Sequence, residues 1–210
     1  VLTPGVGYTG GKYFFVDNFS NHIRIIPEEE VETKKNVLDE IPLTLLNSLN
    51  FFLLSVIYKV LIQKAEPYLS MMVHIDGTQD SNRKYFDWIN SVLEEYNLIV
   101  DDAISQDDLR NEFTYAYDDL SKTVENIPSL DGLLEYLSEA LVYFQVHLLQ
   151  SNADNDVDWD DVTTKGHILV GANMLNRGFT VEKLSTTFMP RTNLTTATAD
   201  TIEQRCRFFG

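Results

Sequence analysis

The chain has 210 residues, of which 44% are hydrophobic and 23% charged, ordinary globular proportions that exclude collagen-like, low-complexity and wholly disordered chains. Its 32 acidic and 16 basic residues give a net charge of −16, which excludes a generic nucleic-acid coat, because phosphate binders normally offer a basic surface. The single cysteine, Cys206, excludes an internal disulfide and a cysteine-based zinc site, and it suits a reducing, cytoplasmic compartment.

Both ends of the chain have the features of cuts through a longer protein. Val1 is not an initiator methionine, and no helix end or tail follows the last residues before Gly210. No basic stretch followed by an apolar run opens the chain, so a signal peptide is not predicted. We therefore expect the native protein to continue beyond both ends.

The negative charge is concentrated in the first 164 residues. These carry ten basic and 29 acidic residues, whereas residues 165–210 carry six basic and three acidic ones. The C-terminal quarter is therefore mildly basic, and an anionic ligand is expected there.

Residues 1–42 are predicted to form an irregular N-terminal segment and a linker. Five glycines and prolines lie within the first eleven residues, a composition that is typical of turns. No Gly-Lys-Ser/Thr sequence follows them, which favours a structured surface loop over a phosphate-binding loop. Residues 27–40 have the composition of an exposed polar linker.

Residues 43 to about 65 are predicted to form a strongly apolar helix, for which Pro42 provides a favourable start. The length of this helix approaches that of a membrane span. Polar residues recur on its remaining face, however, which favours a buried core helix and no membrane contact. These polar residues are Asn47, Ser48, Asn50, Ser55, Lys59 and Gln63.

Strand and helix patterns follow one another along the rest of the chain. Apolar runs typical of buried strands span residues 69–75, 142–149, 167–171 and 184–190. Helical patterns span residues 83–96, residues 101–141 with a break near Pro128, and residues 198–209. This order predicts an α/β fold over residues 43–210, with helices on both faces of the sheet. Residues 98–141 would be a helical insertion or an expanded crossover.

An acidic loop precedes the 167–171 strand. The spacing of Asp154, Asp156 and Asp158 begins like a calcium-binding loop. The glycine that such a loop requires at its sixth position is Trp159 here, and no glutamate closes the loop, so a solvated loop is favoured.

Three histidines fall on or beside the apolar runs, where buried core histidines are favoured over metal ligands. They are His74, His147 and His167.

Two segments near the C-terminus carry residue types that hold anions. In residues 170–180 a strand ends in a loop, in which Gly171 and Gly178 let the backbone approach a ligand closely and Arg177 offers a charged fork. In open α/β sheets, ligands lie beyond the carboxyl ends of the strands, which is where this loop would be.

The second segment, residues 200–210, is predicted to be a helix that presents Gln204, Arg205 and Arg207 within one turn. Neither Glu203 nor Asp200 alone satisfies both arginines, so the pair needs an anion. A triphosphate fits this need, since guanidinium groups stabilise charge on a transferring γ-phosphoryl group. The alternative is a salt-bridge pair at the end of a helix.

The two segments resemble motifs five and six of superfamily-two helicases, in which a strand ends in Arg-Gly, a further strand follows, and a helix carries Gln-x-x-Arg. More narrowly, they are similar to the Z-one domain, a family to which an endonuclease activity is ascribed. Its loop is matched by Gly171, Leu175, Arg177, Gly178, Thr180 and Leu184. Its helix is matched by Asp200, Thr201, Gln204, Arg207, Phe209 and Gly210. Upstream, Pro4-Gly5, Ile41-Pro42 and Met72-Val73-His74 also fit.

The resemblance implies a RecA-like lobe of the P-loop NTPase type, a parallel sheet flanked by helices, in a bacterial DNA-dependent ATPase of a restriction or phage-defence system. ATP and Mg²⁺ are the implied cofactors, held mainly by a first RecA-like lobe of the same polypeptide. DNA and other defence-system subunits are the implied partners. The phosphate-binding lysine and the metal-binding acids belong to the first lobe, so this chain alone is expected to be inactive.

Roles for individual residues also follow from the resemblance. Arg207 matches the first arginine of motif six and is the candidate arginine finger, Gln204 would position the phosphates or their water, and Arg205 lies beside them. The residues implied to contact the nucleic-acid backbone are Gly171, Arg177, Gly178, Thr180, Thr78 and Ser81.

Two alternatives stay open. Thr180 stands where the common helicase loop has Asp, and Cys206 stands where Gly is usual, so a non-catalytic interaction module that keeps a degenerate lobe fits as well. A metal-dependent nuclease would need clustered carboxylates and a lysine, and the nearest pattern is Asp17 with Glu32 and Lys34 in the polar linker.

Overall fold

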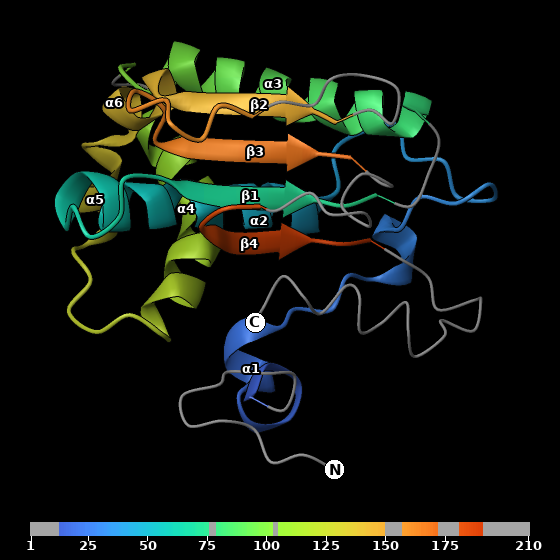
Figure 1. Cartoon of the computed structure of the whole chain (residues 1–210), viewed down its shortest axis with the longest axis horizontal. Coiled ribbons are helices and arrows are strands. Elements are labelled where there is room, and N and C mark those ends of the chain that lie inside the picture. The colour runs from blue at the N-terminus through green and yellow to red at the C-terminus, as the bar shows by residue number, and fades with distance from the viewer. Residues whose placement is uncertain (1–12, 76–78, 103–104, 150–156, 172–180, 191–210) are drawn as a thin grey trace.

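A four-stranded, fully parallel sheet forms the centre of the protein in a computed structural model, which describes residues 13–75, 79–102, 105–149, 157–171 and 181–190. The strands are β1 (Leu69–Val73), β2 (Phe144–Leu148), β3 (Gly166–Val170) and β4 (Leu184–Phe188). Their order across the sheet is β2-β3-β1-β4 (Figure 1). The four apolar runs in the sequence thus form strands as predicted.

The two central strands are the most apolar ones. Every residue of β1 and β3 is buried, whereas the edge strands β2 and β4 are partly exposed. A central strand of a parallel sheet is covered on both faces, which is why the sequences of β1 and β3 lack a polar side.

Helices occupy most of the remaining described chain. The long ones are α2 (Leu43–Val56), α3 (Gln79–Ile99) and α4 (Gln106–Ser121), followed by the short α5 (Leu130–Leu134) and α6 (Leu137–Val142). Helices α3 to α6 all lie in the connection from β1 to β2, and the predicted break near Pro128 separates α4 from α5. Three short helical segments precede them, η1 (Tyr13–Asp17), α1 (Phe19–His22) and η2 (Glu28–Glu30).

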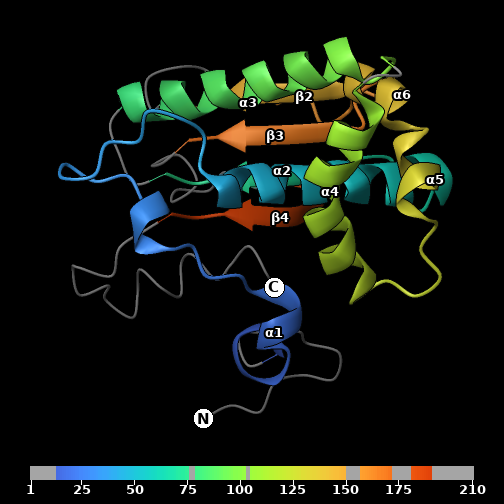
Figure 2. The same ribbon diagram turned by 180° about the vertical axis from the view of Figure 1, so that it is seen from behind.

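The long helices α2, α3 and α4 cover one face of the sheet (Figure 2). The predicted apolar stripe of α4, Leu109, Phe113, Ala116 and Leu120, is buried. Together these elements support an α/β fold with a parallel sheet flanked by helices, consistent with a RecA-like arrangement, but the described helices that pack on the sheet all lie on one face, in contrast to the prediction of helices on both faces. The helix predicted for residues 198–209 lies outside the described residues.

Helix α2 is a core helix, although the stretch Leu43–Ile62 is long and apolar enough to cross a membrane. It packs between the sheet and α4, and it continues into one π-helical segment, η3 (Ile57–Ile62). The prediction that its polar residues share an exposed face is wrong for two of them, since Asn50 and Ser55 are 0% and 7% exposed.

Each of these two buried polar side chains has its own hydrogen-bond partners. The Asn50 amide donates to the Glu112 carbonyl of α4 at 3.3 Å and accepts from the Tyr96 hydroxyl of α3 at 2.9 Å. The Ser55 hydroxyl donates to the Phe51 carbonyl at 2.8 Å. Hydrogen bonding offsets the desolvation cost, so a polar residue in this helix need not face solvent.

The linker before α2 is docked on the core, in contrast to the exposed linker predicted for residues 27–40. Val31 is 5% exposed. A Glu30 carboxylate oxygen accepts hydrogen bonds from both the backbone N–H and the hydroxyl of Thr44, each at 2.7 Å. A carboxylate at a helix N-terminus satisfies orphan N–H groups and interacts favourably with the helix dipole.

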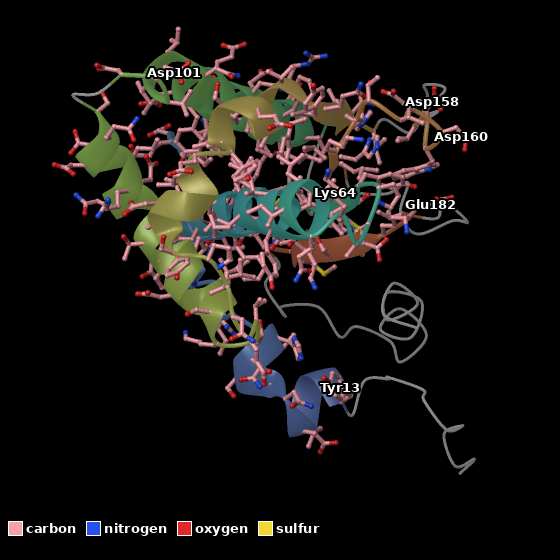
Figure 3. All side chains as sticks on the ribbon, turned by 90° about the vertical axis from the view of Figure 1, so that its left-hand side faces the viewer. Tyr13, Lys64, Asp101, Asp158, Asp160 and Glu182 are labelled. Carbon is pink, nitrogen blue, oxygen red and sulfur yellow. The ribbon has the colours of Figure 1, made fainter. Side chains whose placement is uncertain are left out.

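The second face of the sheet carries a smaller apolar cluster of Met72, Leu149, Val157 and Leu169. Trp159 packs against this cluster, so the segment predicted as a solvated loop is anchored on the sheet by its apolar residues. Figure 3 shows the exposed acidic side chains Asp158, Asp160 and Glu182 on this side of the molecule, far from Asp101 on the helical side.

Gly166 leaves room for the Phe144 ring, which also packs edge-on against Phe52 of α2 with 5.7 Å between ring centroids. A methyl group at Gly166 would lie 2.7 Å from Cδ1 and Cζ of that ring. We expect Gly166→Ala to lower the free energy of unfolding by about 1–3 kcal/mol, as overpacking does, measured by urea denaturation.

Gly132→Ala in α5 is the matched control. Its methyl group would lie 3.4 Å from Oγ of Ser129, an ordinary contact. Because alanine favours helix over glycine, this change should be neutral or stabilise by up to about 1 kcal/mol. Equal effects at the two glycines would contradict the role assigned to the Phe144 ring.

Candidate functional site

The carboxyl ends of β3, β1 and β4 lie side by side at one edge of the sheet (Figure 1). Hydrogen bonds join them up to the last residue of each strand. The Gly171 N–H donates to the Val73 carbonyl at 3.1 Å, and the His74 N–H donates to the Phe188 carbonyl at 2.8 Å. The three strands therefore end level, and the chain leaves them from one row at the edge where ligands bind in open α/β sheets.

The predicted site residues belong to the connections that leave this row. Ser81 lies in the first turn of α3 and is half-buried, and Gly171 directly follows β3. The other predicted residues lie outside the described part of the chain, namely Thr78, Arg177, Gly178, Thr180, Gln204, Arg205 and Arg207. Those in residues 172–180 follow β3, those in residues 191–210 follow β4, and Thr78 lies between β1 and α3.

Gly171 has a close neighbour within the sheet itself. A Cβ at this position would lie 2.9 Å from Cβ and 3.0 Å from the carbonyl oxygen of Leu149, which follows β2. The close backbone approach that a glycine permits here is therefore made by Leu149. This contact fixes the position of the chain where β3 ends.

The N-termini of two long helices also lie at this edge, because α2 and α3 flank β1 in the chain and run antiparallel to it (Figure 2). The terminus of α2 is occupied by the Glu30 carboxylate. The terminus of α3 begins at Gln79, and Asp80 is the acidic residue of its first turn. The N-terminus of α3 carries partial positive charge that favours an anion, and the Asp80 carboxylate in the same turn opposes this effect.

The residues of the nuclease alternative are not gathered into a metal site. Glu32 forms an ion pair with Lys84 of α3, and the same ammonium group donates to the Leu38 carbonyl at 3.0 Å. Lys34 and Asp17 are exposed. Within the described ranges, no group of three or more His, Cys, Asp or Glu side chains could hold a metal ion. The Glu32 carboxylate thus ties the linker to α3.

A histidine pair on the second face of the sheet is a feature that sequence reasoning did not find. Nε2 of His147 on β2 lies 3.1 Å from Nδ1 of His167 on β3. The His167 ring is 0% exposed and meets Tyr68 and Trp159 edge-on, each with 5.1 Å between centroids. His74 is also fully buried, so the core location predicted for the histidines is confirmed for His74 and His167, while His147 is half-buried.

The burial of this pair determines its protonation. Nε2 of His167 has no hydrogen-bond partner within the described residues. An orphaned acceptor is tolerated better than an orphaned N–H, so we assign the proton to Nδ1 of His167, which donates to His147. Burial lowers the pKa of both rings, that of His167 to about 4, with the neighbouring His147 also lowering it and Asp161 opposing the shift. Both rings are therefore neutral at pH 7.

The pair makes stability depend on pH with a defined sign. Since the unfolded chain binds a proton at His167 below about pH 6.5 and the folded chain only near pH 4, unfolding takes up protons between these values. The free energy of unfolding should therefore fall as the pH drops from about 6.5 towards 4. Hydrogen bonds from threonines lower the pKa of Asp161 from 3.8 to about 2. Any effect of Asp161 on stability therefore occurs at pH values below those at which His167 acts.

His167→Phe should flatten this dependence, because a neutral ring that suits its aromatic neighbours replaces the titrating one. Urea denaturation at pH 7 and at pH 5 measures the difference. His22→Phe, which changes an exposed histidine of α1, serves as the control and should keep the original slope. An unchanged slope in His167→Phe would show that the pair does not govern stability in this range.

The chain was also compared with known proteins. The family model described as the Z1 domain matches residues 44–210. No curated protein and no solved structure matches the chain. The matched region includes all four strands, α2 except for its first residue, helices α3 to α6, and both C-terminal segments in which the anion-binding residues are predicted. Since the match covers well over half of the chain, the protein belongs to the Z1 domain family.

Proposed function

We propose that this chain is the C-terminal RecA-like lobe of a helicase-like, DNA-dependent ATPase, and that it supplies arginine side chains to ATP held mainly by a first lobe of the same polypeptide. The observation that carries the proposal is the row of carboxyl ends of β3, β1 and β4. The segments predicted to form the Arg-Gly loop and the Gln-x-x-Arg helix follow β3 and β4 in the sequence, and these two strands end in this row on either side of β1.

The chemistry proposed for the second segment is electrostatic. The Arg207 guanidinium group would face the charge that develops on the γ-phosphoryl oxygens, where a planar fork of donors binds two oxygens at once. Gln204 would orient the attacking water or the phosphates, and Arg205 would add a second positive charge. Bound ATP with Mg²⁺ supplies the transferable phosphoryl group, and this lobe contributes positioning and charge.

The first segment would connect this chemistry to DNA. Arg177, Gly178 and Thr180 follow β3 in the sequence, Thr78 directly precedes α3 in the sequence, and Ser81 lies in its first turn. Backbone N–H groups, hydroxyls and an arginine are the groups that proteins use to hold phosphodiester oxygens without reading sequence. Movement of residues 172–180 would then couple ATP hydrolysis to the contact with the DNA backbone. A restriction or phage-defence system of bacteria is the proposed setting.

Removal of the arginine finger should abolish ATP turnover in the intact protein. We expect Arg207→Ala to lower DNA-stimulated kcat by roughly 10³-fold or more, the scale known for arginine fingers, in a phosphate-release assay. Arg207→Lys should recover little of this loss, since an ammonium group lacks the bidentate fork.

Arg110→Ala is the matched control, because Arg110 lies on α4 and forms an exposed ion pair with Asp131. Exposed pairs contribute little, so its kcat should stay within about twofold of the unchanged protein. Unchanged turnover in Arg207→Ala would instead favour the non-catalytic interaction module.

The 210-residue chain alone should not hydrolyse ATP, because the phosphate-binding lysine and metal-binding acids of the proposed motor belong to the other lobe. A coupled ATPase assay with Mg²⁺ and DNA tests this expectation. Turnover above the buffer background by the purified chain would contradict the proposed division between two lobes.

A further inference from the structure

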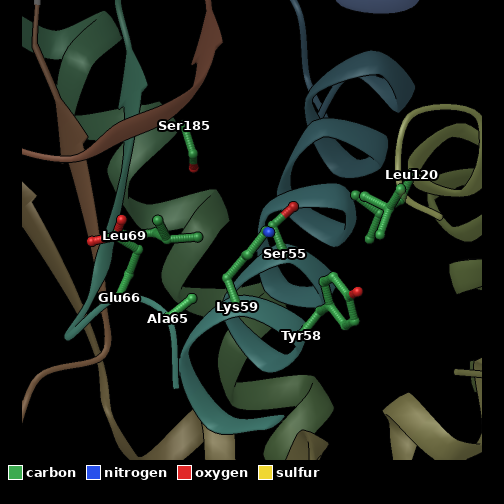
Figure 4. Close-up of a pocket in the computed structure, with 9 residues that line it drawn as sticks. Ser55, Tyr58, Lys59, Ala65, Glu66, Leu69, Leu120 and Ser185 are labelled. Atoms are coloured by element: carbon green, nitrogen blue, oxygen red, sulfur yellow. The ribbon is translucent and has the colours of Figure 1, made fainter. Parts of the chain in front are cut away.

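A pocket of about 330 Å³ lies at the end of the sheet opposite the carboxyl edge. Figure 4 shows its walls, with Leu69 at the start of β1, Ser185 on β4, Lys59 on η3 and Leu120 on α4. Five residues of β1 separate it from the carboxyl edge, about 16 Å at 3.3 Å per residue. A small molecule bound here would therefore not overlap the proposed nucleotide, and the inference below does not rest on the proposed function.

The inner wall of this pocket offers mainly apolar surface to a ligand. Leu69 at the start of β1, Leu120 near the end of α4 and Val124 just after α4 contribute their side chains. The two serines that line it have their hydroxyls engaged within the protein. That of Ser55 donates to the Phe51 carbonyl at 2.8 Å, and that of Ser185 donates to the Ser70 carbonyl at 3.3 Å. The wall thus suits an alkyl or aryl group.

The charge that the pocket leaves uncompensated is positive. Glu66 is paired with Lys183, with 2.6 Å between Nζ and Oε2. Lys59 forms no ion pair with any residue that the structure describes, and its Nζ lies 5.4 Å from the centroid of the Tyr58 ring. Figure 4 places the Lys59 ammonium group beside Ser55, between Leu69 and Leu120. An exposed cation without an anionic partner among the described residues therefore lines a pocket with an apolar inner wall, in a chain whose net charge is −16.

We propose that this pocket binds a small amphipathic organic anion. Its alkyl or aryl body would pack on Leu69, Leu120 and Val124, and its carboxylate would meet the Lys59 ammonium group. The volume is within the range of small-molecule sites, which are mostly apolar with a few polar groups that fix orientation. A neutral ligand of the same shape would leave Lys59 without a partner, and a cationic one would be repelled.

Three probes with one alkyl chain and different head groups test this proposal, namely octanoate, octanol and octylammonium. Isothermal titration calorimetry on the intact protein should give saturable binding of octanoate, with weaker binding of octanol and none of octylammonium. Lys59→Gln should weaken octanoate binding by about five- to tenfold, the scale of a partly exposed charged hydrogen bond, and should leave octanol binding unchanged.

Two further variants keep the test decisive. Val124→Phe, which fills the pocket from the segment that follows α4, should abolish binding of octanoate while far-UV circular dichroism stays unchanged. Lys34→Gln removes an exposed lysine of the linker and should leave the affinity as it is. Equal binding of octanoate and octylammonium, equal effects of the two lysine changes, or no saturable binding of octanoate would each overturn the proposal.

Discussion

The packing of α2 between the sheet and α4 is the interaction on which the rest of the structure depends. Its apolar side chains join the sheet to the helical layer in one continuous core. At its centre Asn50 bonds to both α4 and α3, so that the three long helices meet at one buried amide. A buried amide whose partners all lie on specific neighbours destabilises alternative packings, because any shift leaves a polar group unsatisfied. The position of α3, and hence the carboxyl edge from which it starts, follows from this junction.

Parallel strand pairing then separates the molecule into two ends with different chemistry. All four strands begin at one edge and end at the other, and each connection must return along the helical layer or across the second face. The carboxyl ends of β3 and β4 are therefore neighbours of the carboxyl end of β1, although about 100 residues separate β1 from them in sequence. The opposite end, where η3 and α4 meet the strand starts, is free to hold an unrelated pocket.

Features that depend on the local pattern of residues could be predicted from the sequence, whereas features that depend on distant partners could not. The buried strands were predictable because β1 and β3, buried at every position, are mostly apolar apart from Ser70 and His167, and α2 because its apolar face is wide. Partners distant in sequence were not predictable. Periodicity alone placed Asn50 on a solvent face and gave no sign of the docking of Val31. The contact between His147 and His167 depends on the register of β2 against β3, which a single sequence does not encode in any local pattern. The predicted catalytic arginines lie outside the described residues, so their grouping remains a prediction from sequence.

The partners of the described basic residues limit the set of residues that could bind an anion in the C-terminal quarter. Of its six basic residues, Lys183 is paired with Glu66, and the Lys165 ammonium group donates to the Val162 carbonyl at 2.7 Å. The Lys165 ammonium group keeps its charge, since the carbonyl is neutral, but it lies just before β3, at the edge opposite the carboxyl ends. The other four basic residues are arginines, of which one follows β3 and three follow β4 in the sequence. At ordinary ionic strength, salt screens the interaction between exposed charges that lie more than about 10 Å apart, so exposed acids on the helical side have little effect on a distant anion. A strongly acidic chain can therefore present a basic edge, because the local arrangement of charge, and not its sum, determines which ligand is attracted there.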